Sequence, residues 1–243
     1  MSKKIEFRAL DQYAFDTQLR PFPASQAIPK WWREMTPYLP SPNNIDGKKL
    51  IVDERGHSNA TAKKCTPMLD AITSGYIIPL WADVLVSYKD EDNGEPSVSW
   101  RTSKSIFEIH GPSANFVERP PGYRKGVLKY LNGWIPITPK GYSCLITSPF
   151  GYKDLPLHAV PGIIDSDKSL HDLTVPMWLK DGFEGIIEKG TPLIQVTPFK
   201  RESWQSEFSF FKNNEYDKEM ARGFEGTIVN HYIKNIWSKK TYK

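Results

Sequence analysis

The chain has 243 residues, and its 32 Lys and Arg against 28 Asp and Glu leave a formal net charge of only +4. A hydrophobic share of 39% with eight tryptophans excludes a disordered chain, and two cysteines are too few for a disulfide scaffold. The small charge gives no strong attraction to nucleic acid, and the longest apolar stretch, Gly75–Val86, is too short to span a membrane. No secretion leader opens the sequence. We therefore expect one globular domain over residues 1–243 that is not secreted and has no membrane partner.

The first 60 residues are expected to form an extended arm with short strands. Ile5–Leu10 alternates apolar with charged residues, which favours a strand. The run Ile28–Met35 contains Pro29 at a possible first helical position and predicts one or two helical turns. Trp31 and Trp32 in this run face different sides, so one can pack beneath the domain while the other meets a partner subunit. We assign both to a candidate subunit interface, where aromatic side chains are enriched.

Residues 61–212 are expected to form a β core. A helix is predicted at Thr66–Ser74, with Thr66 as its cap, Pro67 in its first turn and Gly75 as its terminator. Short strands follow, separated by proline and glycine, at residues 76–81, 84–88, 97–100, 106–109, 134–137, 143–147, 157–160, 162–164, 173–179, 185–187 and 192–196. Their recurrence about every 8–12 residues indicates a sandwich or barrel, so the expected fold class is mainly β.

Residues 213–243 are expected to form a helical extension. Helices are predicted at Glu215–Arg222 and at Ile228–Lys240, the second from apolar residues at i, i+4 and i+8. The last fifteen residues carry four lysines and no acid, interleaved with aromatic residues that include Trp237. These lysines could contact phosphate, but cations are favoured at any helix C-terminus. We therefore expect a helix that packs its aromatic residues and exposes its lysines, and we add Trp237 to the candidate interface.

The sequence lacks the usual spacings for metal binding and nucleophilic catalysis, such as His-x-His, Cys-x-x-Cys or Gly-x-Ser-x-Gly. It also has no glycine-rich nucleotide loop. His158, Asp165 and His171 could still form a metal site, and Cys65 precedes a predicted helix N-terminus, which favours a reactive thiolate. Neither hypothesis outweighs ordinary packing, so we expect no metal and no cofactor.

The densest polar group in the chain is the run Gly162–Asp167 (GIIDSD). Two acids follow the β-branched end of a predicted strand, which puts Asp165 and Asp167 on the same face. Such paired carboxylates could hold a water molecule or a cation. The alternative is a turn in which Asp165 and Ser166 cap local backbone N–H groups. The residues alone leave both interpretations open.

This run, followed by Ile187–Val196 (IEKGTPLIQV), resembles the trimeric dUTPase and dCTP deaminase superfamily of β-clip proteins. The upstream run Ile137–Pro149 is similar to the strand that leads into that family's phosphate-gripping motif, and Ser74–Tyr76 resembles part of its first motif. The resemblance implies a β-clip fold and a trimer.

By the same resemblance, Asp165 would be the catalytic residue that holds the attacking water, and Gln195 would contact phosphate. The candidate ligand-binding residues are Asp165, Asp167, Gly190 and Gln195. Three departures are that Ile77 replaces a metal-linked acid, Phe150 begins FGY where RSS would stand, and Lys168 replaces a tyrosine. A dUTPase must neutralise a triphosphate in its transition state. We therefore expect a scaffold retained without its chemistry, with Mg²⁺ only if the protein binds nucleotides.

Four further runs resemble a group of uncharacterised proteins common in tailed phages. They are residues 27–32 (AIPKWW), 64–71 (KCTPMLDA), 74–80 (SGYIIPL) and 198–204 (PFKRESW). The leading hypothesis is therefore a non-catalytic assembly or binding module that forms trimers, has other phage proteins as partners, and acts in the host cytoplasm or the virion. One alternative is a nucleotide-binding or nucleotide-hydrolysing enzyme with an altered substrate. A weaker alternative is a metal-dependent jelly-roll oxygenase.

Overall fold

The computed structural model describes residues 3–55, 57–88, 95–109, 111, 118–169, 171–212, 214–224 and 232–243. The chain divides into two compact units. Unit 1 consists of Met1–Ala27, Gly75–Arg201 and Tyr242–Lys243, and unit 2 consists of Ile28–Ser74 and Glu202–Thr241. The single domain expected from the sequence stays a prediction. Within the described ranges, no helix combines the length and the apolar character that crossing a bilayer requires.

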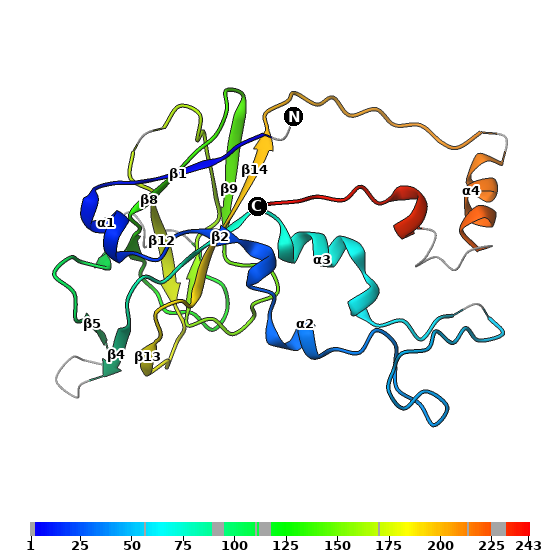
Figure 1. The fold of residues 1–243 in the computed structure, drawn as a ribbon, viewed down its shortest axis with the longest axis horizontal. Coiled ribbons are helices and arrows are strands. Elements are labelled where there is room, and N and C mark those ends of the chain that lie inside the picture. Colours follow the sequence, from blue (N-terminus) through cyan, green and yellow to red (C-terminus); the bar gives the residue numbers. More distant parts are fainter. Residues whose placement is uncertain are drawn as a thin grey trace. The chain divides into compact units, whose positions relative to one another are not determined.

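Unit 1 is built mainly from β-strands, which confirms the prediction of a mainly β fold (Figure 1). Its strands are β1 (Glu6–Ala9), β2 (Phe22–Pro23), β3 (Tyr76–Pro79), β4 (Val84–Tyr88), β5 (Pro96–Trp100), β6 (Phe107–Ile109), β7 (Leu128–Leu131), β8 (Trp134–Ile137), β9 (Tyr142–Thr147), β10 (Leu157–Ala159), β11 (Gly162–Ile164), β12 (Thr174–Leu179), β13 (Gly185–Ile187) and β14 (Pro192–Lys200). It also holds helix α1 (Gln12–Thr17), which Asp11 caps by accepting the backbone N–H of Ala14, and a 3₁₀ turn at Ala24–Gln26.

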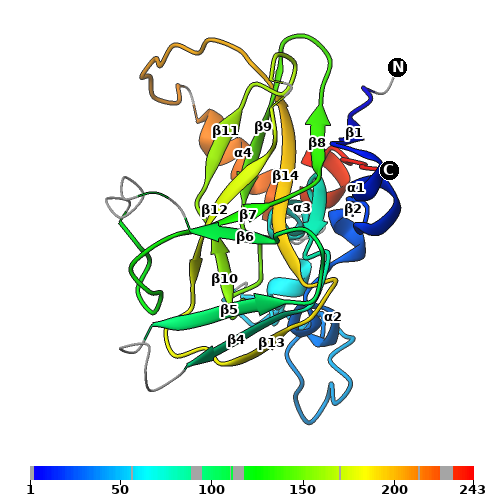
Figure 2. The same ribbon diagram turned by 90° about the vertical axis from the view of Figure 1, so that its left-hand side faces the viewer.

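All strand pairs are antiparallel, and among the described residues they form four open sheets. The strand orders are β11-β9-β14-β3-β2, β10-β12-β7-β6, β13-β4-β5 and β1-β8. Strand β14 is central in the largest sheet, since Gln195 pairs with Ile77 of β3 on one side and with Thr147 of β9 on the other. Strands β5 and β6 each have one neighbouring strand among these residues, so each leaves an open edge there. Figure 2 shows β4, β5 and β13 together at one end of unit 1.

The main core of unit 1 is one large cluster to which three sheets contribute, and Val127 and Trp178 form a smaller second cluster. Ile146 and Val196 come from the five-stranded sheet, Tyr130 and Met177 from the four-stranded sheet, and Val86 from the three-stranded sheet. Because side chains alternate across a strand, each strand can bury one row of apolar residues and expose the other.

We expect Tyr130→Phe to lower the free energy of unfolding by about 1–3 kcal/mol, as for a buried acceptor that loses its donor. The fully buried Tyr130 hydroxyl donates to the carbonyl oxygen of Pro79 at 2.9 Å. Pro79 pairs in the sheet with Pro192, which has no N–H to donate. Urea denaturation would measure the loss, with Tyr123→Phe as control. That half-buried hydroxyl donates over a longer 3.3 Å, so its loss should be smaller, and equal losses would contradict the explanation.

Unit 2 contains short helices and long connections. Its helices are α2 (Lys30–Glu34), α3 (Thr66–Thr73) and α4 (Glu215–Phe224), with a 3₁₀ turn at Ala62–Lys64 and a π-helical turn at Tyr232–Ile236. The prediction of one or two helical turns near Pro29 is confirmed by α2. This helix ends where the Lys63 ammonium donates to the carbonyl oxygens of Trp32 at 2.6 Å and Arg33 at 3.2 Å. A cation at this position also complements the helix dipole.

The helix predicted at Thr66–Ser74 is present as α3, with one correction at its start. Cys65, and not Thr66, occupies the N-cap position, and no side chain there binds a backbone N–H. Pro67 lies in the first turn. Gly75 follows the helix with a φ of +70°, which is the left-handed conformation that ends many helices.

The helix predicted at Ile228–Lys240 is largely wrong where the structure describes it. Residues 228–231 lie outside the described residues, and the rest contributes only the turn Tyr232–Ile236. Beyond that turn, both Trp237 Nε1 and Lys240 Nζ reach one oxygen of Asp70 in α3, at 2.9 Å and 2.6 Å. The chain therefore gains two contacts within unit 2 that amphipathic periodicity does not reveal.

Candidate functional site

The predicted carboxylate pair lies in a turn that follows strand β11. The carbonyl oxygen of Asp165 accepts the backbone N–H groups of Lys168 and Ser169, each at 2.9 Å. The carboxylate of Asp165 does not cap this turn, because its Oδ1 accepts the hydroxyl of Ser143 in β9 at 2.7 Å. The turn therefore directs its acids toward a neighbouring strand.

Arg201, directly after strand β14, binds both carboxylates of this turn. Its Nη1 donates to Asp167 Oδ1 at 2.8 Å and its Nη2 to Asp167 Oδ2 at 2.5 Å, while Nη1 lies 3.1 Å from Asp165 Oδ1. Asp167 Oδ2 also accepts the backbone N–H of Gly141 at 2.7 Å, and only 3% of the Asp167 side chain is exposed. The forked guanidinium thus engages one carboxylate with two bonds and its neighbour with one. We call Asp165, Asp167 and Arg201 the acid–arginine cluster.

The acid–arginine cluster keeps its two acids charged. The Ser143 hydroxyl, together with the charges of Arg201 and Lys168, lowers the pKa of Asp165. Hydrogen bonds from Arg201 and then from the Gly141 N–H lower the pKa of Asp167 further. The bond to Asp167 in turn raises the pKa of Arg201. A general base works best with a pKa near the operating pH, so this electrostatic setting suits binding and bracing better than proton transfer.

The acid–arginine cluster does not fit Mg²⁺ as it stands. A magnesium site needs free carboxylate oxygens beside water and substrate phosphate, whereas Arg201 already binds both oxygens of Asp167 and one of Asp165. Among the described residues, no group of three His, Cys, Asp or Glu side chains is placed to hold a metal ion. Through these contacts, the cluster joins the end of β14 to the turn after β11 and to the turn before β9.

His158, one of the two histidines of the hypothetical metal site, packs against aromatic side chains. His158 in β10 stacks on Trp178 with ring centroids 6.1 Å apart and contacts Tyr123 at 5.4 Å. Burial lowers the pKa of His158, which favours its neutral form. His171, the other histidine of that hypothesis, lies in an exposed bend after the turn that carries Asp165.

The remaining predicted ligand residues, Gln195 and Gly190, lie apart from the acid–arginine cluster. Gln195 is fully buried in β14, where its Oε1 accepts the backbone N–H of Phe150 at 2.8 Å. It pairs with Thr147, four residues along β9 from Ser143, which is about 13 Å in an extended strand. Gly190 lies in the turn before β14, with a φ of +92°, and its N–H donates to the carbonyl oxygen of Leu80 at 2.8 Å. The structure therefore gathers Asp165 and Asp167 but not Gln195 and Gly190.

The three candidate interface tryptophans all have contacts within unit 2. Trp32 is 2% exposed, and Trp31 packs edge-on against it with ring centroids 5.5 Å apart. Trp237 is half-buried and donates to Asp70. Trp31 is the most accessible of the three, at 36% exposed.

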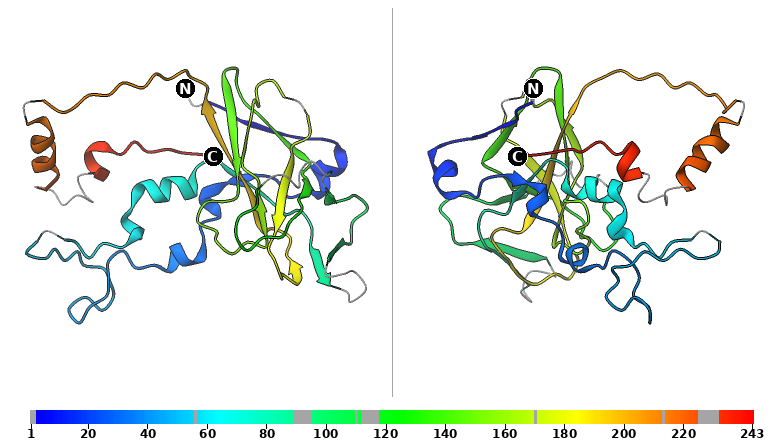
Figure 3. Two further views of the ribbon diagram at one scale, coloured as in Figure 1. Left: turned by 180° about the vertical axis from the view of Figure 1, so that it is seen from behind. Right: turned by 45° about the vertical axis from the view of Figure 1, so that its right-hand side comes forward.

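Sequence reasoning missed a set of aromatic residues in residues 202–212, which we call the aromatic segment. The sequence assigned it to the β core, but it has no regular secondary structure (Figure 3). All its residues are exposed. Trp204, Phe208 and Phe210 are 85%, 94% and 80% exposed. The sequence signal that could have found them is their even spacing, because alternate residues of an extended chain share one side. Phe211, on the other side, instead contacts the ring of Tyr216 in α4.

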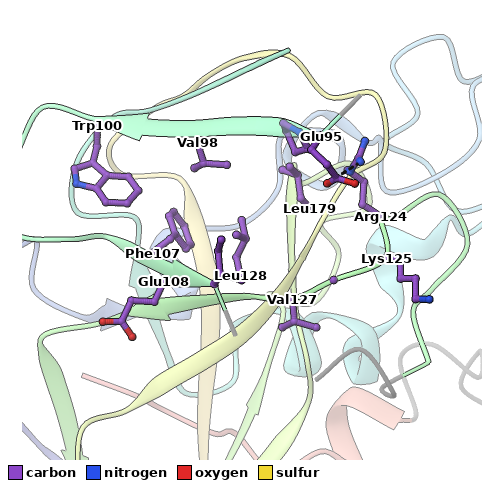
Figure 4. Close-up of a pocket in the computed structure, with 13 residues that line it drawn as sticks. Glu95, Val98, Trp100, Phe107, Glu108, Arg124, Lys125, Val127, Leu128 and Leu179 are labelled. Atoms are coloured by element: carbon purple, nitrogen blue, oxygen red, sulfur yellow. Dashed lines mark ion pairs between the residues drawn. The ribbon is translucent and has the colours of Figure 1, made fainter. Parts of the chain in front are cut away.

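Unit 1 contains an apolar groove between the edge strands β5 and β6, with a volume of about 270 Å³. Figure 4 shows Trp100 and Phe107 at one end of the groove and the ion pair of Glu95 with Arg124 at the other. Val98, Leu128 and Leu179 line the space between them. We call this cavity the β5–β6 groove. Its middle is apolar, and neither bordering strand has a second partner strand among the described residues.

The sequence matches no protein-family model and no curated protein.

Proposed function

We propose that this protein is a non-catalytic assembly module, and that the aromatic segment joins its copies. The observation that carries this proposal is the exposure of Trp204, Phe208 and Phe210, which alternate with polar residues as in a half-buried strand. The described residues provide no partner strand for this segment. An exposed segment with this alternation favours a second chain as the surface that it packs on.

The size of the exposed aromatic surface supports the same conclusion. Three buried aromatic side chains remove roughly 450–750 Å² from water, at 150–250 Å² each. At about 25 cal/mol per Å², their burial contributes on the order of 10 kcal/mol before the entropic costs of association. Monomeric proteins rarely leave such a patch exposed, so contact with another chain accounts for it best.

The acid–arginine cluster supports the non-catalytic part of the proposal. Asp165 would be the catalytic residue of a dUTPase-like enzyme, but its carboxylate binds Ser143 and Arg201. Gln195, expected at the phosphate, is buried and binds the backbone of Phe150. These contacts support a role for both side chains in bracing the sheet.

The finer identity of the module comes from the sequence resemblance. We infer a β-clip protein of phage type that forms trimers, with other phage proteins as further partners, in the host cytoplasm or the virion. The runs that carry this inference are residues 162–167 and 187–196 for the β-clip fold and residues 27–32 and 198–204 for the phage context.

Sedimentation velocity of the full chain at increasing micromolar concentration tests this function. We expect an oligomer for the natural sequence, and a monomer when Trp204, Phe208 and Phe210 are all replaced by serine. Phe211→Ser is the matched control, since it removes an exposed aromatic from the other side of the segment and should leave the oligomer intact. A monomeric natural protein, or an oligomer that the triple substitution does not change, would overturn the proposal.

A further inference from the structure

The β5–β6 groove has the features of an acceptor for an extended strand. In the part of the chain that the structure describes, β5 ends the three-stranded sheet and β6 ends the four-stranded sheet, so each has an edge without a partner strand there. Pro96, Val98 and Trp100 alternate along β5 and all line the groove. Strand addition of this kind takes affinity from backbone hydrogen bonds and specificity from pockets for alternate side chains.

The aromatic segment has the matching pattern. Trp204, Phe208 and Phe210 share one side of an extended chain with Ser206, and the other side holds the polar residues Ser203, Gln205, Glu207 and Ser209, with Phe211 at its end. From Trp204 to Phe208 an extended chain covers about 13 Å, the same span as from Pro96 to Trp100 in β5.

The charges around the groove favour the same partner. Arg124 is already paired, with Glu95 at 3.1 Å and Asp181 at 3.6 Å. Its neighbour Lys125 is exposed, and no acid lies within ion-pair distance of it in the described part of the chain. Glu207 lies in the middle of the aromatic segment, so it can approach this lysine from the solvent side.

We propose that the aromatic segment of one copy adds as a strand to the open edge of β5 in a second copy. Trp204 and Phe208 fill the β5–β6 groove, and Glu207 lies beside Lys125. This inference rests on the proposed function and deepens it, because it names the surface that receives the segment. It makes the groove part of a subunit interface.

Binding of a fluorescein-labelled peptide of residues 201–212 to the full-length triple-serine variant tests this placement. That variant lacks a competing aromatic segment, so its groove is free for the peptide. We expect saturable binding with a micromolar dissociation constant. Lys125→Glu should weaken it several-fold, and Val98→Lys should abolish it. Lys125→Glu changes only an exposed rim residue, so it remains informative even if Val98→Lys fails to fold. Leu85→Lys, on the opposite face of the same sheet, is the control and should bind as tightly as its parent.

Three results would overturn the placement: no saturable binding, equal binding of a scrambled peptide, or binding that neither Lys125→Glu nor Val98→Lys changes. The two proposals fail in different ways. If the natural chain forms an oligomer through the aromatic segment but the peptide ignores the groove, only the acceptor is wrong. If the natural chain is monomeric in sedimentation, the proposed function itself fails.

Discussion

Replacing Gly75 with alanine is expected to lower the free energy of unfolding by more than about 3 kcal/mol, which is among the largest effects of single substitutions. Gly75 has a φ of +70°, a conformation that costs a residue with a side chain roughly 1–2 kcal/mol. An added Cβ would also lie 2.0 Å from the carbonyl oxygen of Val196 and 2.9 Å from the Cα of Thr197. Both atoms belong to the backbone of β14, the centre of the five-stranded sheet, so the clash cannot be relieved by rotating a side chain.

Gly190→Ala is the matched control for this prediction. Gly190 also has a positive φ, at +92°, but the nearest atom to an added Cβ is the Leu19 Cδ1 at 4.0 Å. Only the conformational cost remains, so we expect a loss of about 1–2 kcal/mol. Urea denaturation of both variants measures the difference. Equal losses would show that the close approach of Gly75 to β14 has no energetic weight.

Replacing Arg201 with methionine is expected to lower the melting temperature at neutral pH by several degrees. The substitution leaves Asp165 and Asp167 as neighbouring carboxylates without their cation, and removing one partner of a partly buried ion pair leaves an uncompensated charge. Lys168→Met is the control, because Lys168 is an exposed partner of Asp165 at 3.8 Å, and such pairs contribute little. A loss for Lys168→Met as large as that for Arg201→Met would contradict the assigned role.

The pH dependence of the Arg201→Met effect should reveal its electrostatic origin. In the natural protein the pKa values of Asp165 and Asp167 are lowered, so their contribution to stability is present above the unfolded-state pKa of about 3.9 and is lost as the pH falls below it. Without Arg201, two adjacent carboxylates repel each other and protonation relieves the repulsion. The difference in melting temperature between the two proteins should therefore shrink as the pH falls from neutral to about 3. A constant difference would indicate lost packing instead.

The strands of this protein are largely predictable because each carries its own local signal. The runs that became β4, β9 and β12 are rich in β-branched or aromatic residues and are bounded by turn residues, so no knowledge of the partner strand is needed. Helix α3 was equally predictable, from Pro67 in its first turn and Gly75 after its end. Helix α1 was missed, since a six-residue helix has little periodicity and its main signal is the Asp11 cap.

The candidate site depended on information that is not local. Arg201 lies 34 residues from Asp167, and the two meet only because β14 and β11 both pair with β9. Similarly, the buried position of Gln195 follows from β14 having a neighbour on each side. For the aromatic segment, a local sequence signal is present but the expected strand is not. Its alternation is a valid strand signal, but the strand that it would pair with is not among the described residues of its own chain.

Photo-crosslinking from position 208 tests most directly whether the aromatic segment of one copy contacts another copy. Benzoylphenylalanine replaces Phe208, keeping an aromatic side chain there, and equal amounts of ¹⁵N-labelled and unlabelled protein are mixed and equilibrated before irradiation. We predict crosslinked peptides that combine one labelled and one unlabelled partner, with the second partner drawn from β5 or β6. Crosslinks that join only peptides of the same label would place the segment on its own chain and contradict assembly through it.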